Sequence, residues 1–138
     1  MKMLRTSCIT LIGVYVIAAA VYAAELTPIH LPAPQTSGGK PLMQALAERK
    51  SARSYSPKEL PPQVLSDMLW AACGINRPAT GMRTAPTAKN LQEINVYVVL
   101  AAGVYRYDAA ANTLVPTVAG DIRAATGAQE FVKDAPVN

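Results

Sequence analysis

Residues 94–118 read INVYVVLAAGVYRYDAAANTLVPTV, a run dominated by β-branched and aromatic side chains. Within residues 94–101 both alternating faces are apolar, which predicts a central strand covered on each side by other elements. Residues 104–107 and 113–118 flank the short segment 108–112, which begins with Asp108 and ends with Asn112, an arrangement typical of a β-hairpin. This stretch therefore predicts the sheet around which the rest of the chain folds.

Two helices are predicted upstream of the sheet. The first covers about residues 41–50, starts with a proline in a favoured first-turn position, and has Leu42 and Leu46 on one face. The second covers residues 61–74, begins with two prolines and ends at a glycine C-cap. The apolar stripe of this second helix comprises Val64, Leu65, Met68, Leu69 and Ala72.

The remaining body of the chain carries weaker signals. Residues 75–92 contain glycine and prolines and are expected to form a long loop, a feature that is often functional in a small domain. A short helix is expected at residues 121–126, closed by Gly127, and a further helical turn at 129–133. Helices and strands together indicate an α+β fold, and the length allows one domain.

The N-terminus has the order of a cleavable secretory signal. Lys2 and Arg5 precede an apolar run at residues 8–20, and small residues lead to a cleavage site after Ala23. An uncleaved anchor is the alternative, although the apolar stretch is shorter than the ~20 residues of a spanning helix. We therefore expect residues 1–23 to be removed and the protein to be periplasmic or extracellular. Residues 24–40, rich in proline and glycine, are expected to be an extended leader without regular structure.

Charge and composition exclude several classes of function. The net charge is +4, and loss of Lys2 and Arg5 with the signal lowers it by two to +2, too little to indicate nucleic acid or an anionic membrane as a partner. The single histidine, His30, lies in the leader, so neither a His-based triad nor a His-rich metal site is expected. Cys73 is the one cysteine beyond the signal and is expected to be a small buried hydrophobe.

Two polar segments carry candidate chemistry. Arg49, Lys50, Ser51 and Arg53, here called the basic cluster, follow the first helix and suit a phosphate. The alternative is that these cations simply favour a helix C-terminus and face water. The second segment spans residues 83–92, ahead of the predicted strand. Its Asn90 and Gln92 amides suit the ribityl chain and ring edge of a flavin, and an ordinary polar loop is the alternative.

Taken in order, these motifs resemble the nitroreductase-like family of FMN-dependent oxidoreductases. Residues 49–53 fit its R-(R/H/K)-S-x-R pattern and residues 86–92 its P-(S/T)-A-x-N-x-Q pattern. Residues 69–75 fit the family's LLWAAxG helix end. Residues 103–108 (GVYRYD) and 126–132 (TGAQEFV) are similar to the SagB-type, thiazoline-oxidase-like dehydrogenase branch. The resemblance covers residues 41–138, which are expected to form the N-terminal part of a nitroreductase-like domain.

The resemblance implies a central antiparallel or mixed sheet flanked by helices, apparently truncated at the C-terminus. It also implies a homodimer with FMN at the subunit interface, which passes a hydride or an electron pair to a small-molecule substrate through flavin N5. No catalytic residue is indicated, and no metal, nucleic acid or membrane partner is expected after signal cleavage. The rival interpretation is a non-catalytic flavin-binding or structural remnant of such an enzyme.

The same resemblance assigns cofactor-binding positions. The phosphate and the nearby ring edge fall to Arg49, Lys50, Ser51 and Arg53. The flavin is lined, partly from the partner subunit, by Pro86, Thr87, Ala88, Asn90 and Gln92.

Overall fold

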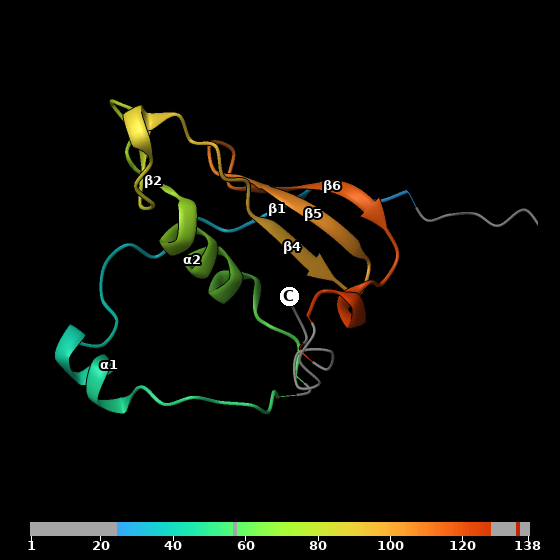
Figure 1. Cartoon of the computed structure of the whole chain (residues 1–138), viewed down its shortest axis with the longest axis horizontal. Coiled ribbons are helices and arrows are strands. Elements are labelled where there is room, and N and C mark those ends of the chain that lie inside the picture. Colours follow the sequence, from blue (N-terminus) through green and yellow to red (C-terminus); the bar gives the residue numbers. More distant parts are fainter. Residues whose placement is uncertain (1–24, 57, 128–134, 136–138) are drawn as a thin grey trace, which may run out of the picture.

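The computed structural model describes residues 25–56, 58–127 and 135. The predicted signal at 1–23 and the predicted helical turn at 129–133 lie outside the described residues. In the described part, one antiparallel sheet is packed against one long helix, and a small two-stranded hairpin and a short helix lie apart from this centre (Figure 1).

The main sheet confirms the predicted hairpin. Strand β5 (Gly103–Asp108) pairs along its length with β6 (Thr113–Ala119), and β4 (Tyr97–Leu100) pairs with the other edge of β5. A fourth strand, β1 (Ile29–His30), adds to β6, which gives the order β1-β6-β5-β4. The sheet is therefore antiparallel throughout, as the resemblance allowed.

Two polar residues close the turn of this hairpin. The Asp108 carboxylate accepts hydrogen bonds from the backbone N–H of Ala110 at 2.9 Å and of Ala111 at 3.3 Å. Asn112 ends the turn with a φ of 47°, in the left-handed region that asparagine tolerates better than most residues. The polar segment between the two apolar runs thus folds the chain back locally, and sequence was sufficient to predict it.

The expectation that residues 94–101 form a central strand is wrong for the described residues. Strand β4 lies at one edge of the sheet, and it covers only part of the predicted range. Val98 and Val99 are buried on opposite faces, whereas Tyr97 is 51% exposed. Apolar side chains on both faces indicate that the faces are covered, but the position of a strand in its sheet depends on backbone pairing along its edges, which side-chain pattern does not report.

The leader is part of the fold, which corrects the expectation of no regular structure. Ile29 pairs with Leu114 of β6, and the backbone N–H of Leu31 donates to the Asn112 carbonyl at 3.1 Å. The carbonyl of Pro32 accepts hydrogen bonds from the Ser66 hydroxyl at 2.6 Å and from Asn112 Nδ2 at 2.7 Å. The leader therefore ties the sheet to the long helix, although its backbone is extended as predicted.

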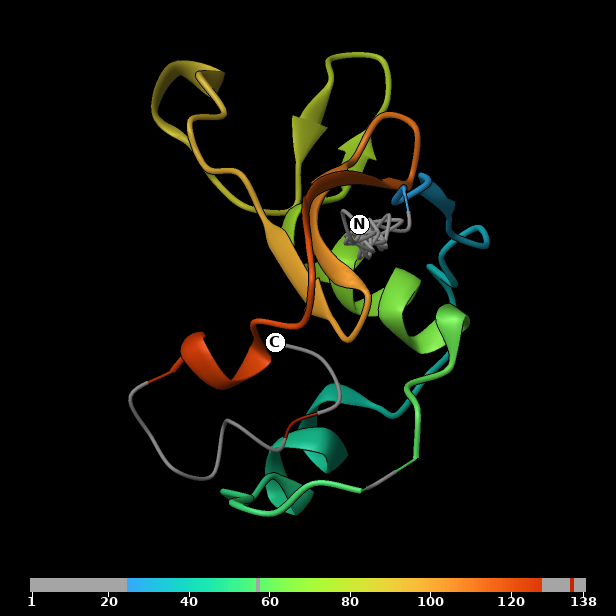
Figure 2. The same ribbon diagram turned by 90° about the vertical axis from the view of Figure 1, so that its right-hand side faces the viewer.

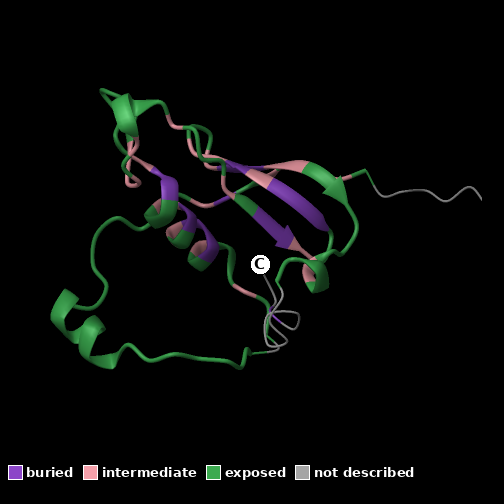
Figure 3. Ribbon diagram, in the orientation of Figure 1, coloured by how far each residue is buried: buried purple, intermediate pink, exposed green. Residues whose placement is uncertain are grey.

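The long helix α2 (Pro62–Cys73) packs across one face of the sheet and supplies much of the core. The buried cluster comprises Leu31, Leu65, Leu69, Val98, Tyr105, Tyr107 and Leu114 (Figure 3). Of the predicted stripe, Leu65 and Leu69 face this cluster, but Val64 is 41% and Met68 57% exposed. The helix was predicted correctly, but its buried face is narrower than the predicted apolar stripe. One turn after Leu69, Cys73 extends this buried face to the end of the helix.

The glycine that follows α2 is required for a steric reason. Gly74 caps the helix and its N–H donates to the Trp70 carbonyl at 2.8 Å. Its backbone is extended, with a φ of −71°, so no left-handed conformation requires glycine here. A Cβ at Gly74 would instead lie 2.4 Å from Trp70 Cδ1, so only glycine lets the chain leave the helix against this ring.

The first helix is confirmed as α1 (Leu42–Glu48), but its apolar face packs on nothing in the described chain. Leu42 is 72%, Met43 75% and Leu46 55% exposed. Figures 1 and 2 show α1 held away from the sheet by extended segments on both sides, and Figure 3 shows it exposed throughout. We refer to Leu42, Met43 and Leu46 as the α1 apolar face.

The expected loop at residues 75–92 contains regular structure, which is a second correction. Strands β2 (Ile75–Arg77) and β3 (Met82–Arg83) form a small antiparallel hairpin, and a 3-10 turn, η1 (Ala88–Asn90), follows. The short helix expected at 121–126 is present as a single 3-10 turn, η2 (Arg123–Ala125).

The described residues offer neither a membrane-spanning helix nor a metal-binding group. None of their helices has the length and apolar character needed to cross a membrane. Within the same residues, no three His, Cys, Asp or Glu side chains are grouped so that they could hold a metal ion.

Candidate functional site

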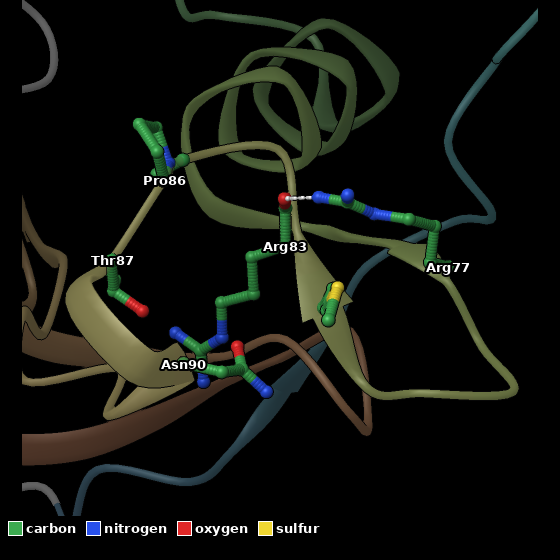
Figure 4. Close-up of a pocket in the computed structure, with 7 residues that line it drawn as sticks. Arg77, Arg83, Pro86, Thr87 and Asn90 are labelled. Atoms are coloured by element: carbon green, nitrogen blue, oxygen red, sulfur yellow. Dashed lines mark hydrogen bonds between the residues drawn. The ribbon is translucent and has the colours of Figure 1, made fainter.

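A pocket of about 210 Å³ lies between the β2–β3 hairpin and the loop that follows it (Figure 4). The hairpin and the loop contribute Arg77, Met82, Arg83, Ala85, Pro86, Thr87 and Asn90. Pro86, Thr87 and Asn90 are three of the positions assigned to flavin contact from the sequence, and the fold brings them to one pocket. Ala88, a fourth such position, is exposed and does not line it.

The loop beside this pocket has a strained backbone. Lys89, Asn90 and Gln92 have φ values of 51°, 56° and 51°, in the left-handed region that residues other than glycine rarely adopt. Each such residue costs roughly 1 kcal/mol or more, and this conformation persists only where surrounding contacts hold it. Strain of this kind clusters at binding and catalytic sites, so the loop is a candidate site on grounds independent of its sequence motif.

Gln92 supplies the contacts that hold this conformation. Its Nε2 donates to the Gly81 carbonyl at 2.9 Å and to Asn90 Oδ1 at 3.1 Å, and its backbone N–H donates to Thr87 Oγ1 at 3.3 Å. The side chain thus joins the loop to the β2–β3 turn. Gln92 was predicted to contact the flavin. In the structure its amide nitrogen donates hydrogen bonds within the chain, and one of them orients Asn90.

Replacing Gln92 by Ala should loosen the loop without unfolding the protein. Two side-chain hydrogen bonds are lost, so the free energy of local opening should fall by about 1–2 kcal/mol. Hydrogen exchange at the backbone amides of residues 87–92 measures this directly. Gln44→Ala on α1 is the matched control, because that glutamine bonds only to Glu48 among the described residues. Equal protection in both variants would show that Gln92 does not hold the loop.

The basic cluster lies elsewhere on the chain. Arg49, Lys50, Ser51 and Arg53 are all exposed in the extended segment after α1. The ion pairs of the described residues join Lys40 to Glu48 and Arg123 to Asp121, so no carboxylate there neutralises the cluster. Figures 1 and 2 both show α1 at the bottom of the view and the β2–β3 hairpin at the top, so one chain does not bring the cluster to the pocket.

The sequence assigned no role to the two arginines of the pocket, although Arg83 opens the candidate segment 83–92. Arg77 donates from Nη2 to the Arg83 carbonyl at 2.9 Å, and Arg83 donates from Nη1 to the Cys73 Sγ at 3.0 Å. Neither arginine belongs to a periodic pattern, and they meet only because the hairpin folds back. Cys73 is buried, as predicted, with 4% of its surface exposed.

The comparisons with known proteins agree with this geometry. A model of the nitroreductase family matches residues 46–138. Among solved structures, a candidate nitroreductase from Ralstonia eutropha JMP134, determined at 2.00 Å, is similar with 46% sequence identity and a TM-score of 0.74. That match covers 80% of this chain and 52% of the other, so the chain spans about half the length of that relative. No curated protein matches.

The fold is therefore nitroreductase-like, with an antiparallel sheet and few helices in the described part. The family match takes in the basic cluster, the strained loop and strands β4, β5 and β6 of the sheet. The chain belongs to the nitroreductase family.

Proposed function

We propose that this chain is the flavin-binding part of an exported, FMN-dependent oxidoreductase. Family membership supports a flavin-dependent oxidoreductase. The observation that carries the proposal is the strained loop at residues 89–92, whose Asn90 lines a pocket together with Pro86 and Thr87, at three of the positions assigned to the flavin. When bound, FMN supplies transfer of a hydride or electron pair through N5, and the protein supplies binding and electrostatics.

The donors of the basic cluster fit the phosphate of FMN. Two guanidinium forks, an ammonium and a hydroxyl offer charge-assisted hydrogen bonds to a dianion. Because no carboxylate of the described residues pairs with them, these donors need not give up an ion pair to bind it. The loop residues fit the other end of the cofactor, since Asn90 offers an amide to polar ring atoms and Pro86 an apolar contact.

Two copies of the chain would complete the site. The basic cluster after α1 and the pocket beside the β2–β3 hairpin lie apart in one chain, so a single FMN would take its phosphate contacts from one protomer and its ring contacts from the partner (Figures 1 and 2). The α1 apolar face offers exposed Leu42, Met43 and Leu46 for such an association. Unpartnered apolar patches of this kind favour interfaces.

Two finer assignments rest on sequence. The GVYRYD segment at residues 103–108, now seen as β5, supports the SagB-type branch and a small-molecule substrate. The order of charged, apolar and small residues at 1–23 supports export to the periplasm or beyond. N-terminal sequencing of the exported protein tests the second, because a mature chain that still starts at Met1 would contradict cleavage.

Replacing Arg49 by Ala should weaken FMN binding by about 1.5–3 kcal/mol, or roughly 10–150-fold in Kd, because one charge-assisted contact to phosphate is lost. Titration of the protein with FMN, followed by quenching of flavin fluorescence, measures the change. Lys58→Ala is the control, an exposed cation outside the basic cluster. An unchanged FMN affinity in Arg49→Ala would mean that the basic cluster does not bind the phosphate and is only a set of solvated cations after a helix.

Co-expression with an Asn90→Ala variant extends this test to the two-copy site. If each FMN uses the cluster of one protomer and the loop of the other, every mixed dimer of Arg49→Ala and Asn90→Ala chains has one unaltered site. The mixture should then recover a fraction of tight FMN binding that neither variant has alone. No recovery in a mixed dimer would place both contacts on one chain.

A further inference from the structure

The pocket between the β2–β3 hairpin and the strained loop carries two positive charges and no negative one. Arg77 and Arg83 both line it, and none of its other lining residues is acidic. In the described part of the chain neither guanidinium forms an ion pair. Like charges gathered without a counter-charge oppose folding, so this arrangement is typical of a site that binds an anion.

Arg83 has hydrogen-bonding capacity that the protein does not use. Its Nε is buried and has no acceptor among the described residues, while Nη1 is spent on a weak acceptor, Cys73 Sγ. A buried donor left unsatisfied costs about 1–3 kcal/mol. Figure 4 shows its side chain extending along the pocket toward Asn90, with Arg77 anchored to the Arg83 backbone. Both guanidiniums are thus fixed before any ligand arrives.

We propose that this pocket binds the carboxylate of a small anionic substrate. The planar guanidinium fork matches the two oxygens of a carboxylate, and neither guanidinium of the pocket has to give up an ion pair to bind them. A volume of about 210 Å³ is smaller than typical sites for drug-sized ligands, so the pocket suits a small acid. Because Pro86, Thr87 and Asn90 line the same pocket, the carboxylate would lie beside the flavin.

The same chemistry could serve a different oxyanion, the phosphate of FMN itself. A substrate carboxylate is favoured here because the basic cluster already offers the cofactor's phosphate a set of donors without ion pairs. That the ligand is a substrate rests on the proposed function, whereas anion binding at Arg77 and Arg83 does not. The test therefore measures anion binding on the flavin-free chain and FMN binding separately.

The experiment is calorimetric titration of the full chain with benzoate, with neutral benzamide as its isostere and inorganic phosphate as the competing oxyanion. Benzoate should bind roughly tenfold or more tightly than benzamide. Arg77→Gln should lower benzoate affinity by a similar factor and leave FMN affinity unchanged. Arg83→Gln should do the same. If the loss of this half-buried side chain prevents folding, the exposed Arg77→Gln decides the result. Arg106→Gln, on β5 outside the pocket, is the control.

Three results would overturn the proposal. Equal binding of benzoate and benzamide would show that the pocket does not select an anion. An unchanged benzoate affinity in Arg77→Gln would show that the anion binds outside this pocket. Stronger binding of phosphate than benzoate, together with loss of FMN but not riboflavin affinity in Arg77→Gln, would assign the pocket to the cofactor's phosphate. In the first two cases intact FMN binding leaves the proposed function standing.

Discussion

Replacing Leu114 by Ala should destabilise the protein by about 2–5 kcal/mol, the usual cost of emptying a fully buried leucine site. Leu114 has 0% of its surface exposed, and it sits in β6 between Ile29 of β1 and Tyr107 of β5. Its side chain belongs to the cluster that joins α2 to the sheet. Loss of this side chain therefore leaves a cavity where three segments meet.

Urea unfolding followed by fluorescence of Trp70, the single tryptophan, measures this loss. Leu91→Ala is the control, because Leu91 is 61% exposed and the same truncation should change the free energy of unfolding by no more than about 0.5 kcal/mol. Similar midpoints for the two variants would show that the buried cluster around Leu114 is not the core of the protein.

Gly103→Ala should cost at least about 3 kcal/mol, the upper end of the range for overpacking. Gly103 opens β5 opposite Ala119, and a Cβ there would lie 2.3 Å from the Val118 carbonyl oxygen and 2.7 Å from Leu26 Cδ1. The leucine side chain can move, but the carbonyl belongs to the paired strand. The β5–β6 pair would have to separate at this end, with loss of ladder hydrogen bonds.

Gly120→Ala separates this steric effect from the general cost of removing a glycine. Gly120 has a φ of 102°, in the left-handed region, but no atom lies within 4 Å of its added Cβ. Its substitution should cost about 1 kcal/mol from backbone strain alone. Thermal melts of both variants give the comparison, and an equal loss in the two would rule out the clash at Gly103.

The parts of the fold that sequence predicted are those whose signals are local. The β5–β6 hairpin follows from two apolar runs about a polar turn, and α2 follows from spacing, prolines and a closing glycine. The edge position of β4 and the pairing of β1 depend on contacts between distant segments, which periodicity does not encode. The exposure of the α1 apolar face has the same cause, since a pattern shows that a face is apolar but not what covers it.

The candidate site was predictable to a similar degree. The order of motifs pointed to the basic cluster and to the loop around Asn90, and the structure finds Pro86, Thr87 and Asn90 in one pocket. Arg83 opened the polar segment 83–92 but was given no role, and Arg77 left no signal, because a hairpin hidden in an expected loop brings the two together. Gln92 was assigned to the flavin, and its hydrogen bonds to Gly81 and Asn90 add a role in holding the loop that only atomic positions reveal.

The attachment of the leader to β6 also orders events in time. His30 bonds to Thr113, 83 residues further along the chain, so β1 cannot pair until β6 has been synthesised. At ~5–20 residues per second, the ribosome needs roughly 4–17 s to cover that distance. A hairpin such as β5–β6 closes in about 1–10 μs once its residues are available. Strand β1 therefore waits seconds for its partner strand to be made, whereas the β5–β6 hairpin needs only microseconds to close.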